Sequence, residues 1–507
     1  MTSPSASNGD TESRPRVPPP EWRMPVIGGV LFLLLAVGLM ASLLPTGRTA
    51  TVPSTAIPTL GLASVAAPVG SESSSWYCTG STGTPGGIAD ATLSFVNTGH
   101  LAVSGTVTVV NATGQSATRA ISLPGGRETN VSPEGIQQGN WLASTVQLDG
   151  GGVTVSEIVE GSAGWSEAPC ATRTNPDWYF ATGSTELGDL LFDFVYNPGA
   201  VPAVVDLKFV STQGESAPEP FEGLVIAPGS VVVAGVGSFV QNQQSVATLV
   251  QAQSGSVVAA QLEQSTVGSL SGLSLLLGSP RSGTRWSFPR TVNTAGGQVS
   301  LGVLNPSSSA QFVRVEVDLA SGPAAPFVQE VAPDSTWNLL LSGTTRIPQG
   351  EDYTLTVVSR GGGGVVVGRV AQSSSTAAPP QWGMQSGIAA PAAAISSRKW
   401  VIPSPSVPGN PPEPGAVPYA LAIQNTNGHA VSVRVDSVDP DGPVGLASVP
   451  VLRIPPRSFL VIEASQLMAT SSDALLVVSS GPVAVMEDDS PAGAPGIVSL
   501  AGIPLAA

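Results

Sequence analysis

Four sequence marks recur in the same order four times, and this repetition constrains the fold more than any other feature. Each repeat opens on a tryptophan, and the four openings are Trp76, Trp178, Trp286 and Trp400. An apolar segment that ends in an asparagine turn follows, with its asparagine at Asn97, Asn197, Asn305 and Asn425. A period of about 100 residues with ordered internal marks indicates one structural unit used four times.

Two further marks separate the expected strands within each repeat. The first is a turn headed by proline, at Pro124, Pro228, Pro333 and Pro456. The second is a glycine-led hairpin into an apolar strand, which starts at Gly152, Gly255, Gly364 and Gly481. Asn and Gly tolerate a positive φ and Pro presets its own φ, so we expect the asparagine turns to use that freedom.

Within a repeat, apolar residues alternate with a period of two. Leu190, Phe192, Phe194 and Tyr196 share one expected strand face. With 58 Gly, 46 Pro and only 11% charged residues, the composition favours many short strands and turns over long helices. About seven strands per repeat predict an all-β chain of four tandem immunoglobulin-like antiparallel β-sandwiches. The predicted sandwich boundaries are 73–173, 174–281, 282–395 and 396–507.

The residues before the first repeat predict a membrane attachment. Residues 1–24 are Ser- and Pro-rich and predict a disordered tail. Residues 25–45 predict one transmembrane helix, because Val26–Leu44 carry no charge and just reach across a bilayer. More Arg before the span than after it puts the N-terminus in the cytoplasm and the rest outside. A cleaved signal peptide, which would give a secreted protein, is the alternative, and residues 46–72 are expected to be a spacer.

Cys78 and Cys170 are the only two cysteines. An even count in an exported chain predicts one disulfide, with two buried free thiols as the alternative. The bond would join the first strand of the first sandwich to its exit. Neither a C-x-x-C pair nor neighbouring His ligands is present for a redox or zinc site.

The sequence predicts no catalytic residue, cofactor or metal site. A net charge of −15 argues against a nucleic-acid partner. The two histidines, His100 and His429, follow asparagine turns and are expected to be surface residues. One repeated position holds Glu157, Gln261, Arg369 and Glu487, so it cannot supply a shared acid or base. Two cation candidates remain, the acidic run 487–489 and the turn 439–442. Neither has the ligand spacing of a calcium loop, so we expect a solvated strand end and a solvated turn.

Tryptophan rings are the remaining candidates for a binding surface, because exposed rings can stack on sugars. The four opening tryptophans share one position, which favours a structural role in the core or at a domain junction. Trp141, Trp165, Trp337 and Trp382 share none, so any of them could be an exposed platform.

With these marks in hand, the exported part resembles an actinobacterial family of secreted or membrane-anchored proteins, domain of unknown function 5719. The resemblance rests on layout and composition. It implies a cell-envelope setting, and it supplies no catalytic residue. We therefore expect a non-enzymatic structural or adaptor protein of the envelope whose partner is another envelope protein. The alternative is a carbohydrate-binding accessory of cell-wall glycan assembly.

Overall fold

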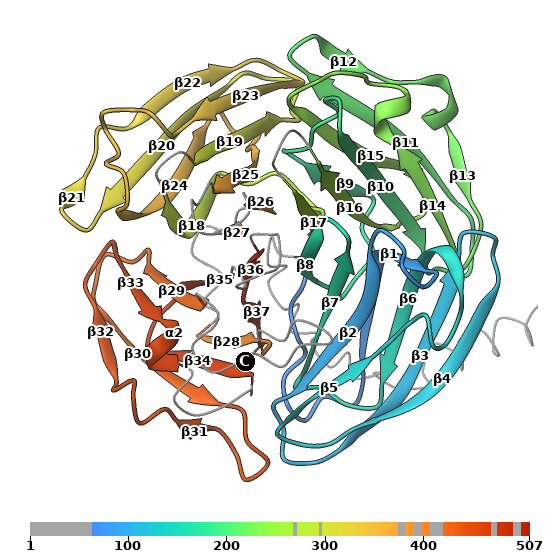
Figure 1. Cartoon of the computed structure of the whole chain (residues 1–507), viewed down its shortest axis with the longest axis horizontal. Helices are drawn as coiled ribbons and strands as arrows, with labels where there is room; N and C mark the ends of the chain where they lie inside the picture. Colours follow the sequence, from blue (N-terminus) through green and yellow to red (C-terminus); the bar gives the residue numbers. More distant parts are fainter. Residues whose placement is uncertain are drawn as a thin grey trace, which may run out of the picture. The chain divides into compact units, whose positions relative to one another are not determined.

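The structure is a computed structural model in which almost every described residue outside turns lies in a β-strand (Figure 1). It describes residues 63–266, 271–293, 297–373, 381–386, 388–389, 398–404, 419–467, 474–489 and 498–506. All of these residues belong to one compact unit. The predicted tail, the membrane segment and residues 46–62 of the predicted spacer lie outside the described residues, in which no helix is long and apolar enough to cross a membrane.

The strands form four successive modules that follow the four sequence repeats. Module 1 contains β1 (Ser74–Gly83), β2 (Asp90–Asn97), β3 (Val103–Asn111), β4 (Ser116–Leu123), β5 (Arg127–Val131), β6 (Gly139–Leu148), β7 (Val153–Gly161) and β8 (Gly164–Pro169). Module 2 contains β9 (Asp177–Phe180), β10 (Asp189–Asn197), β11 (Ala203–Ser211), β12 (Gly214–Ser216), η1 (Glu219–Phe221), β13 (Leu224–Ile226), β14 (Ser230–Gly235), η2 (Val236–Ser238), β15 (Val246–Ser254), β16 (Val258–Ser265) and β17 (Gly272–Leu277).

The second half of the chain repeats this order of strands. Module 3 contains β18 (Arg285–Val292), β19 (Gln298–Asn305), β20 (Gln311–Leu319), β21 (Gly322–Pro323), β22 (Phe327–Val331), β23 (Ser335–Leu340), β24 (Asp352–Arg360), β25 (Val366–Ser373), β26 (Gln381–Ser386) and β27 (Ile388–Ala389). Module 4 contains β28 (Lys399–Ile402), β29 (Tyr419–Asn425), β30 (Val431–Ser437), β31 (Val444–Gly445), β32 (Leu452–Ile454), β33 (Ser458–Glu463), α2 (Ala464–Leu467), β34 (Leu475–Ser479), β35 (Ala484–Asp489), β36 (Val498–Ala501) and β37 (Ile503–Pro504).

Each module packs two antiparallel sheets against each other. In module 2 the sheets have the orders β12-β11-β15-β9 and β14-β10-β16-β17. Modules 3 and 4 repeat these orders, and in module 1 a parallel pairing of Thr82 with Asp90 joins the two sheets at one edge. The prediction of an all-β chain with antiparallel sheets, consistent with tandem sandwiches, is confirmed.

The connections differ from the predicted immunoglobulin order. Successive long strands alternate between the two sheets, so β9, β11 and β15 share one sheet, whereas β10, β14 and β16 share the other. In an immunoglobulin domain the first two strands share a sheet. Eight strand positions recur rather than the expected seven, because a closing strand (β8, β17, β26, β36) adds to the edge of one sheet in every module.

The opening tryptophans lie in the module cores and link the two sheets. All four are at most 3% exposed. The ring N–H of Trp178 donates to the carbonyl of Val257 at 2.8 Å, and Trp286 makes the matching bond to Val365 at 2.8 Å. Both carbonyls belong to the glycine-led hairpin mark, so the first and last marks of a repeat meet across the sandwich.

The repeated asparagines are buried, and they hold the turns through their side chains. The amide of Asn197 donates to the carbonyls of Val201 and Ile226 at 2.8 and 3.0 Å, and its oxygen accepts the N–H of Gly199 at 2.9 Å. The same pattern recurs around Asn97, Asn305 and Asn425.

The reason that we gave for these asparagines is wrong, because none of the four has a positive φ. The left-handed conformation occurs instead in the proline-headed turns, at the residue just before the next strand. Gly126, Gly229, Asp334 and Arg457 take it there.

Residues 63–72 belong to the folded unit and correct the predicted spacer, which ran to residue 72. Ala63 packs in the core of module 2, and Ala66 packs in that of module 1. The N–H groups of Gly152 and Thr172 donate to the carbonyls of Ala67 and Ala63 at 2.8 and 3.0 Å. Ala63 and Ala66 are at most 7% exposed, so the start of this segment is packed against both modules.

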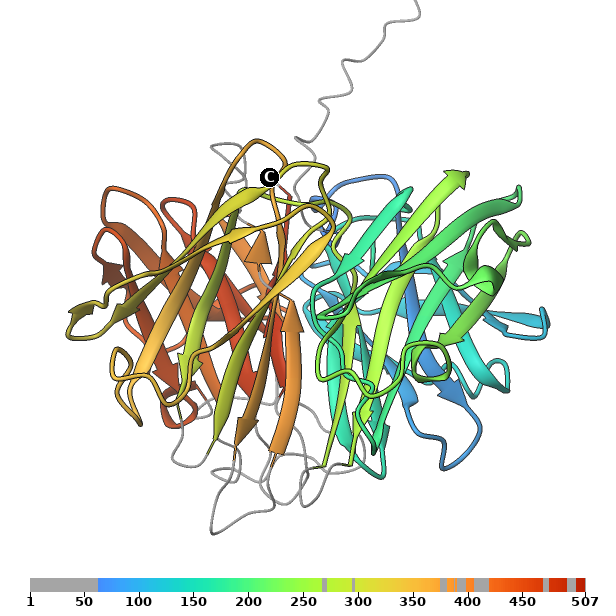
Figure 2. The same ribbon diagram turned by 90° about the horizontal axis from the view of Figure 1, so that it is seen from above.

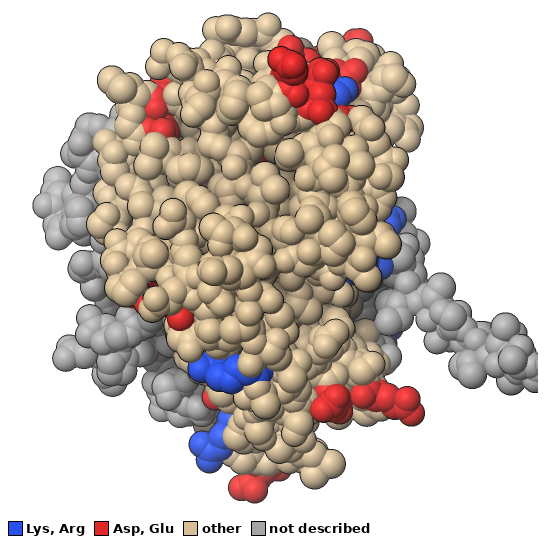
Figure 3. Space-filling view, turned by 90° about the vertical axis from the view of Figure 1, so that its right-hand side faces the viewer, with Lys and Arg blue, Asp and Glu red and all other residues tan. Residues whose placement is uncertain are grey.

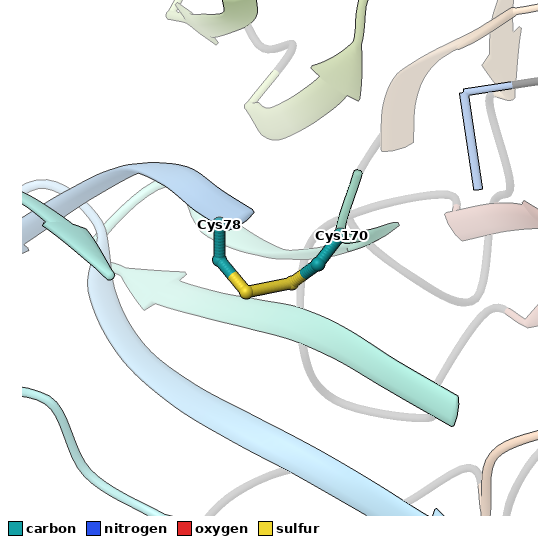
Figure 4. Close-up of a disulfide and its surroundings, with 2 residues drawn as sticks. All are labelled: Cys78 and Cys170. Atoms are coloured by element: carbon teal, nitrogen blue, oxygen red, sulfur yellow. A yellow bond between two sulfur atoms is a disulfide. The ribbon is translucent and has the colours of Figure 1, made fainter. Parts of the chain in front are cut away.

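Cys78 and Cys170 form a disulfide that ties β1 to the segment after β8 (Figure 4). The corresponding exit segments of the other modules also return to their opening strands. Ser279 pairs with Tyr179, β27 pairs with β18, and β37 pairs with β28. The bond therefore reinforces, in module 1, a closure that the other modules make with backbone hydrogen bonds alone.

Replacement of a repeated asparagine should destabilise its module. Asn197→Ala leaves the buried carbonyl of Ile226, the partly buried carbonyl of Val201 and the N–H of Gly199 without their partner, and the loss of a buried partner costs about 1–3 kcal/mol. We expect the free energy of opening β10 and β13 to fall by about 2–4 kcal/mol, as measured by native-state hydrogen exchange. Asn130→Ala, at an exposed position on β5, is the control. Equal exchange protection in the two variants would contradict this role of the asparagine.

Candidate functional site

The four modules contact one another in cyclic order within the compact unit. Their closing strands lie side by side, with β8 against β17, β17 against β26, β26 against β36, and β36 against β8 (Figure 1). Seen from above, the strands of modules 1 and 2 (blue to green) lie on one side and those of modules 3 and 4 (yellow to red) on the other (Figure 2). A functional surface could therefore lie at one of the four junctions between modules as well as on a single module.

Modules 1 and 2 share an apolar junction. Phe194, Tyr196 and Leu262 of module 2 pack with Val110 and Val159 of module 1 in one buried cluster. The Tyr196 hydroxyl lies 2.8 Å from that of Thr145 in module 1. This junction buries large side chains and one hydrogen bond, as the interior of a domain does.

Trp141 and Trp165 also lie at or near this junction. The ring of Trp141 lies 4.9 Å from that of Phe192 and 5.3 Å from that of Phe194, measured between centroids. Trp165 is buried in β8, and Trp337 packs against the core of module 3. The side chain of Trp382 lies outside the described residues. No described tryptophan side chain therefore presents the freely exposed ring that we considered as a sugar platform.

Module 4 closes onto module 1 through both ends of the unit. The N–H of Ala66 donates to the carbonyl of Pro504, and the N–H of Ala506 donates to that of Ala66, each at 2.9 Å. Ile503 and Leu505 fill the core around Trp76.

Further contacts between modules 1 and 4 lie beside this closure. The backbone N–H of Ser404 donates to Glu128 at 2.9 Å, and Val96 packs with Val401 and Leu476. Gly126 lies so close to the turn 439–442 that a Cβ atom on it would be 2.1 Å from the carbonyl oxygen of Asp439. His100 lies beside Gly442 in the same place. The turn that we weighed as a cation site is thus a contact between modules.

An ionic network joins modules 3 and 4. Asp488 lies 3.4 Å from Arg290 and 3.6 Å from Arg369, and Arg369 also donates to the hydroxyl of Ser499 at 2.8 Å. Burial lowers the pKa of Arg369, and the charge of Asp488 opposes that shift. The acidic run 487–489 was expected to be a solvated end or a cation site, but its central carboxylate pairs with two guanidinium groups of the neighbouring module. Among the described residues, no cluster of His, Cys, Asp and Glu could hold a metal ion.

A cleft of about 420 Å³ lies between modules 2 and 3. Module 2 contributes the loop that precedes β10 and the ends of β11, β15 and β16, and module 3 contributes β19, β23 and β25. The lining is mostly polar and comprises Thr182, Gly183, Ser184, Glu186, Asp189, Thr212, Gln244, Ser245, Glu263, Ser265, Gln298, Ser300, Gly302, Asn338, Leu340, Val370 and Gln372.

The walls of the cleft are fixed by contacts between the two modules. The hydroxyl of Ser245 donates to the side-chain oxygen of Asn338 at 2.9 Å. Gly302 packs so closely that an added Cβ atom would lie 2.2 Å from the carbonyl oxygen of Ala181. Tyr179 and Leu249 of module 2 pack into the core of module 3. The space between the modules is thus part of a packed junction.

Three carboxylates of module 2 line the cleft, those of Glu186, Asp189 and Glu263, and the last two are held by hydrogen bonds. Asp189 accepts hydrogen bonds from the hydroxyls of Ser184 and of Ser265, the latter at 2.6 Å. Glu263 is fully buried, and one of its oxygens accepts the N–H of Ser184 at 3.0 Å. Burial raises the pKa of Glu263 well above its ordinary value, and the charges of Asp189 and Asp193 raise it further, against the lowering effect of the Ser184 N–H.

Our sequence interpretation named none of these cleft residues. The repeats offered little signal, because the position of Glu263 holds Val159 in module 1 and Ala371 in module 3 but a second carboxylate, Asp489, in module 4. A carboxylate at this position therefore does not distinguish module 2 from module 4. The repeat marks themselves, which drew our attention, turned out to be structural.

Charge is sparse on the face of the unit that carries modules 1 and 2. In Figure 3, acidic and basic side chains form small separated groups on a neutral surface. With a net charge of −15, the chain offers no extended basic surface there for a polyanion.

The comparisons with known proteins give similarity and no activity. Residues 150–326 match a family of unknown function (DUF5719). No curated protein matches the sequence. A crystal structure of Thermotoga maritima 1070 is 18% identical, with a TM-score of 0.19, and covers 21% of this chain and 93% of that one. A tetra-tandem repeat in the extending region of a large adhesion protein is 11% identical, with a TM-score of 0.12, and covers 87% of this chain and 100% of that one. Neither TM-score is high enough for the similarity to carry an argument.

Addition of a methyl group at Gly126 should loosen the closure between modules 4 and 1. Gly126→Ala places a Cβ atom against the backbone of Asp439, whereas Gly114, which also has a positive φ, has open space around it. The difference between Gly126→Ala and Gly114→Ala therefore isolates the clash from the backbone strain. We expect faster hydrogen exchange of residues 439–442 in Gly126→Ala alone. Equal exchange in both variants would refute the contact.

A buried carboxylate in module 2 should make stability depend on pH. Asp193 accepts hydrogen bonds from Thr248 and Gln261, each at 2.9 Å, and burial raises its pKa from 3.8 to about 7. Between these values the folded protein holds a proton that the unfolded chain has lost. Stability therefore falls as the pH rises through this window.

Replacement of Asp193 by asparagine, its neutral isostere, should remove the loss of stability that accompanies rising pH. We expect Asp193→Asn to gain on the order of a few kcal/mol relative to the wild type between pH 4 and pH 8. The Gln261 amide can turn to accept from the new Asn, because its oxygen has no partner. Asp149→Asn, on the surface, is the control in chemical denaturation at both pH values. A gain in the free energy of unfolding that is the same at pH 4 and pH 8 would contradict the raised pKa of Asp193.

Proposed function

We propose that the chain is a non-enzymatic structural or adaptor protein of the cell envelope, and that its four modules act as one rigid scaffold. The observation that carries this proposal is the closure of the unit, in which Ala66 pairs with Pro504 and Ala506. Tandem domains on flexible linkers move relative to one another by default. Here both ends of the array are held in one core, so partners on different modules would be held at fixed distances.

The junction contacts support a scaffold over a set of independent binding modules. An apolar cluster at modules 1 and 2, a shared core at modules 2 and 3, and the Asp488 network at modules 3 and 4 each restrict motion between neighbours. Large buried apolar contacts are the usual condition for a fixed arrangement of domains.

The setting of the scaffold is proposed from the N-terminal sequence. Val26–Leu44 would anchor the protein in the plasma membrane as a single span, with the N-terminus in the cytoplasm and the modules outside, or would be removed from a secreted form. The Cys78–Cys170 disulfide favours an oxidising compartment. The match to the family of unknown function agrees with the resemblance of the sequence, and the actinobacterial envelope setting is what that resemblance implies.

The carbohydrate-binding alternative loses the observation on which it was based. It depended on an exposed tryptophan, and the described tryptophan side chains are buried, packed at a junction or, for Trp337, packed against the core of module 3. We therefore propose a protein partner in the envelope ahead of a cell-wall glycan.

In-cell photo-crosslinking from defined positions tests the adaptor role. Phe312 and Val328 are exposed apolar residues on neighbouring strands of module 3, and Leu101 is exposed in module 1. A crosslinker at one of these sites should capture a single identified envelope protein, whereas one at the exposed polar residue Thr113 should not. Capture of many unrelated proteins from every position would overturn the adaptor proposal.

A further inference from the structure

We infer that the cleft between modules 2 and 3 binds a small organic cation that carries a primary ammonium group together with hydroxyl groups. The cleft has a volume of about 420 Å³, which is within the range of small-molecule sites. This inference is independent of the scaffold role, because a rigid scaffold needs no cleft.

Two buried polar groups in the lining lack partners, and they point to a bound group. Glu263 is 0% exposed and Thr182 is 3% exposed. One carboxylate oxygen of Glu263 and the hydroxyl of Thr182 have no hydrogen-bond partner. Buried polar atoms in native proteins are almost always satisfied by protein, water or a ligand. Both residues line the cleft, so a group placed there could satisfy both.

The charges of the lining select the sign of the ligand. Glu186, Asp189 and Glu263 line the cleft, and none of the described residues that line it is Lys, Arg or His. An ammonium group would supply the missing positive charge and donate to Glu263, and charge-assisted hydrogen bonds are the strong ones. Burial and the neighbouring acids raise the pKa of Glu263, so a nearby cation would relieve the cost of ionising it.

The rest of the lining favours hydroxyl groups over a metal ion or an apolar ligand. The remaining polar side chains are hydroxyls and amides, such as Ser300 and Gln372, which both donate and accept. They suit a ligand with several hydroxyls. A metal ion would need three or more converging ligands, and the described residues contain no such cluster.

Both modules contribute to the walls, so the ligand would contact residues far apart in the sequence. Asp189 and Glu263 belong to module 2, and Gln298, Ser300 and Gln372 belong to module 3. Binding should therefore stabilise the junction as well as fill the cleft, since a ligand stabilises the state that binds it.

Glucosamine and glucose form a matched pair of probes, because they differ only in an ammonium or a hydroxyl group at one carbon. We would titrate both, and spermidine, into the complete exported part by calorimetry at low salt. A charge-assisted hydrogen bond contributes enough to change affinity about tenfold or more. We therefore expect glucosamine to bind at least about tenfold more tightly than glucose.

Variants locate the site. Glu263→Gln should weaken glucosamine binding about tenfold, and Glu219→Gln, at an exposed carboxylate outside the cleft, should leave it unchanged. Gln298 is exposed at the wall, so its replacement should not disturb folding. Gln298→Lys should weaken binding by repulsion, and Gln298→Glu should strengthen it, which keeps the test valid if Glu263→Gln misfolds.

Three outcomes would overturn the proposed cation site. Equal affinity for glucose and glucosamine would make the cleft a neutral polyol site and refute the cation. No saturable binding of glucosamine or spermidine would mean that ordered water alone satisfies Glu263 and Thr182. Binding that is unaffected by both Gln298 variants would place the ligand elsewhere. None of these results would bear on the scaffold role.

Discussion

The backbone pairing of Ala66 with Pro504 and Ala506 is the constraint on which the arrangement of the modules depends. A linear array of sandwiches exposes the outer faces of its first and last modules. Here those faces cover each other, and the core around Trp76 contains Ile503 and Leu505 from the opposite end of the chain. Each of the other junctions is thereby held in place from both sides, which explains why short polar contacts such as Ser245 to Asn338 can keep a fixed geometry.

The modules achieve this rigidity with little charge and few aromatic residues. A buried asparagine in each module binds the carbonyls of two separate segments, so one side chain fixes both the first turn and the approach to the proline-headed turn. Valine and alanine then fill sandwiches whose strands carry few long side chains. The junctions are formed by residues that are not repeated from module to module. The four interfaces therefore differ in their balance of apolar, polar and ionic contacts.

Much of the fold could be predicted from the sequence, because local marks report on local structure. The repeat of tryptophan, asparagine and proline turns gave the modules, and the alternation of apolar residues gave their strands. The path of the strands between the sheets could not be predicted, since alternation fixes which face a residue occupies and leaves open which sheet it joins.

The cyclic contacts were also out of reach of the sequence. Ala63 and Ala66 are small residues in a segment that reads as a linker, and only their packing partners far along the chain show otherwise. The cleft was missed for a related reason. Glu263 and Asp189 are unremarkable in sequence, and they come together with Gln298 and Gln372 only because two modules meet.

The alternation of strands between sheets has a consequence for how the protein is made. Every module contains local hairpins, such as β7 with β8, but its opening strand pairs with a strand distant in sequence, such as β1 with β6. Folding must therefore close long loops before the sheets are complete. The first module carries the further burden that Leu505 completes its core. If the modules cross a membrane in the order of the sequence, module 1 emerges earliest and is completed last. The disulfide between Cys78 and Cys170 would hold that module in its folded topology while the remaining chain arrives.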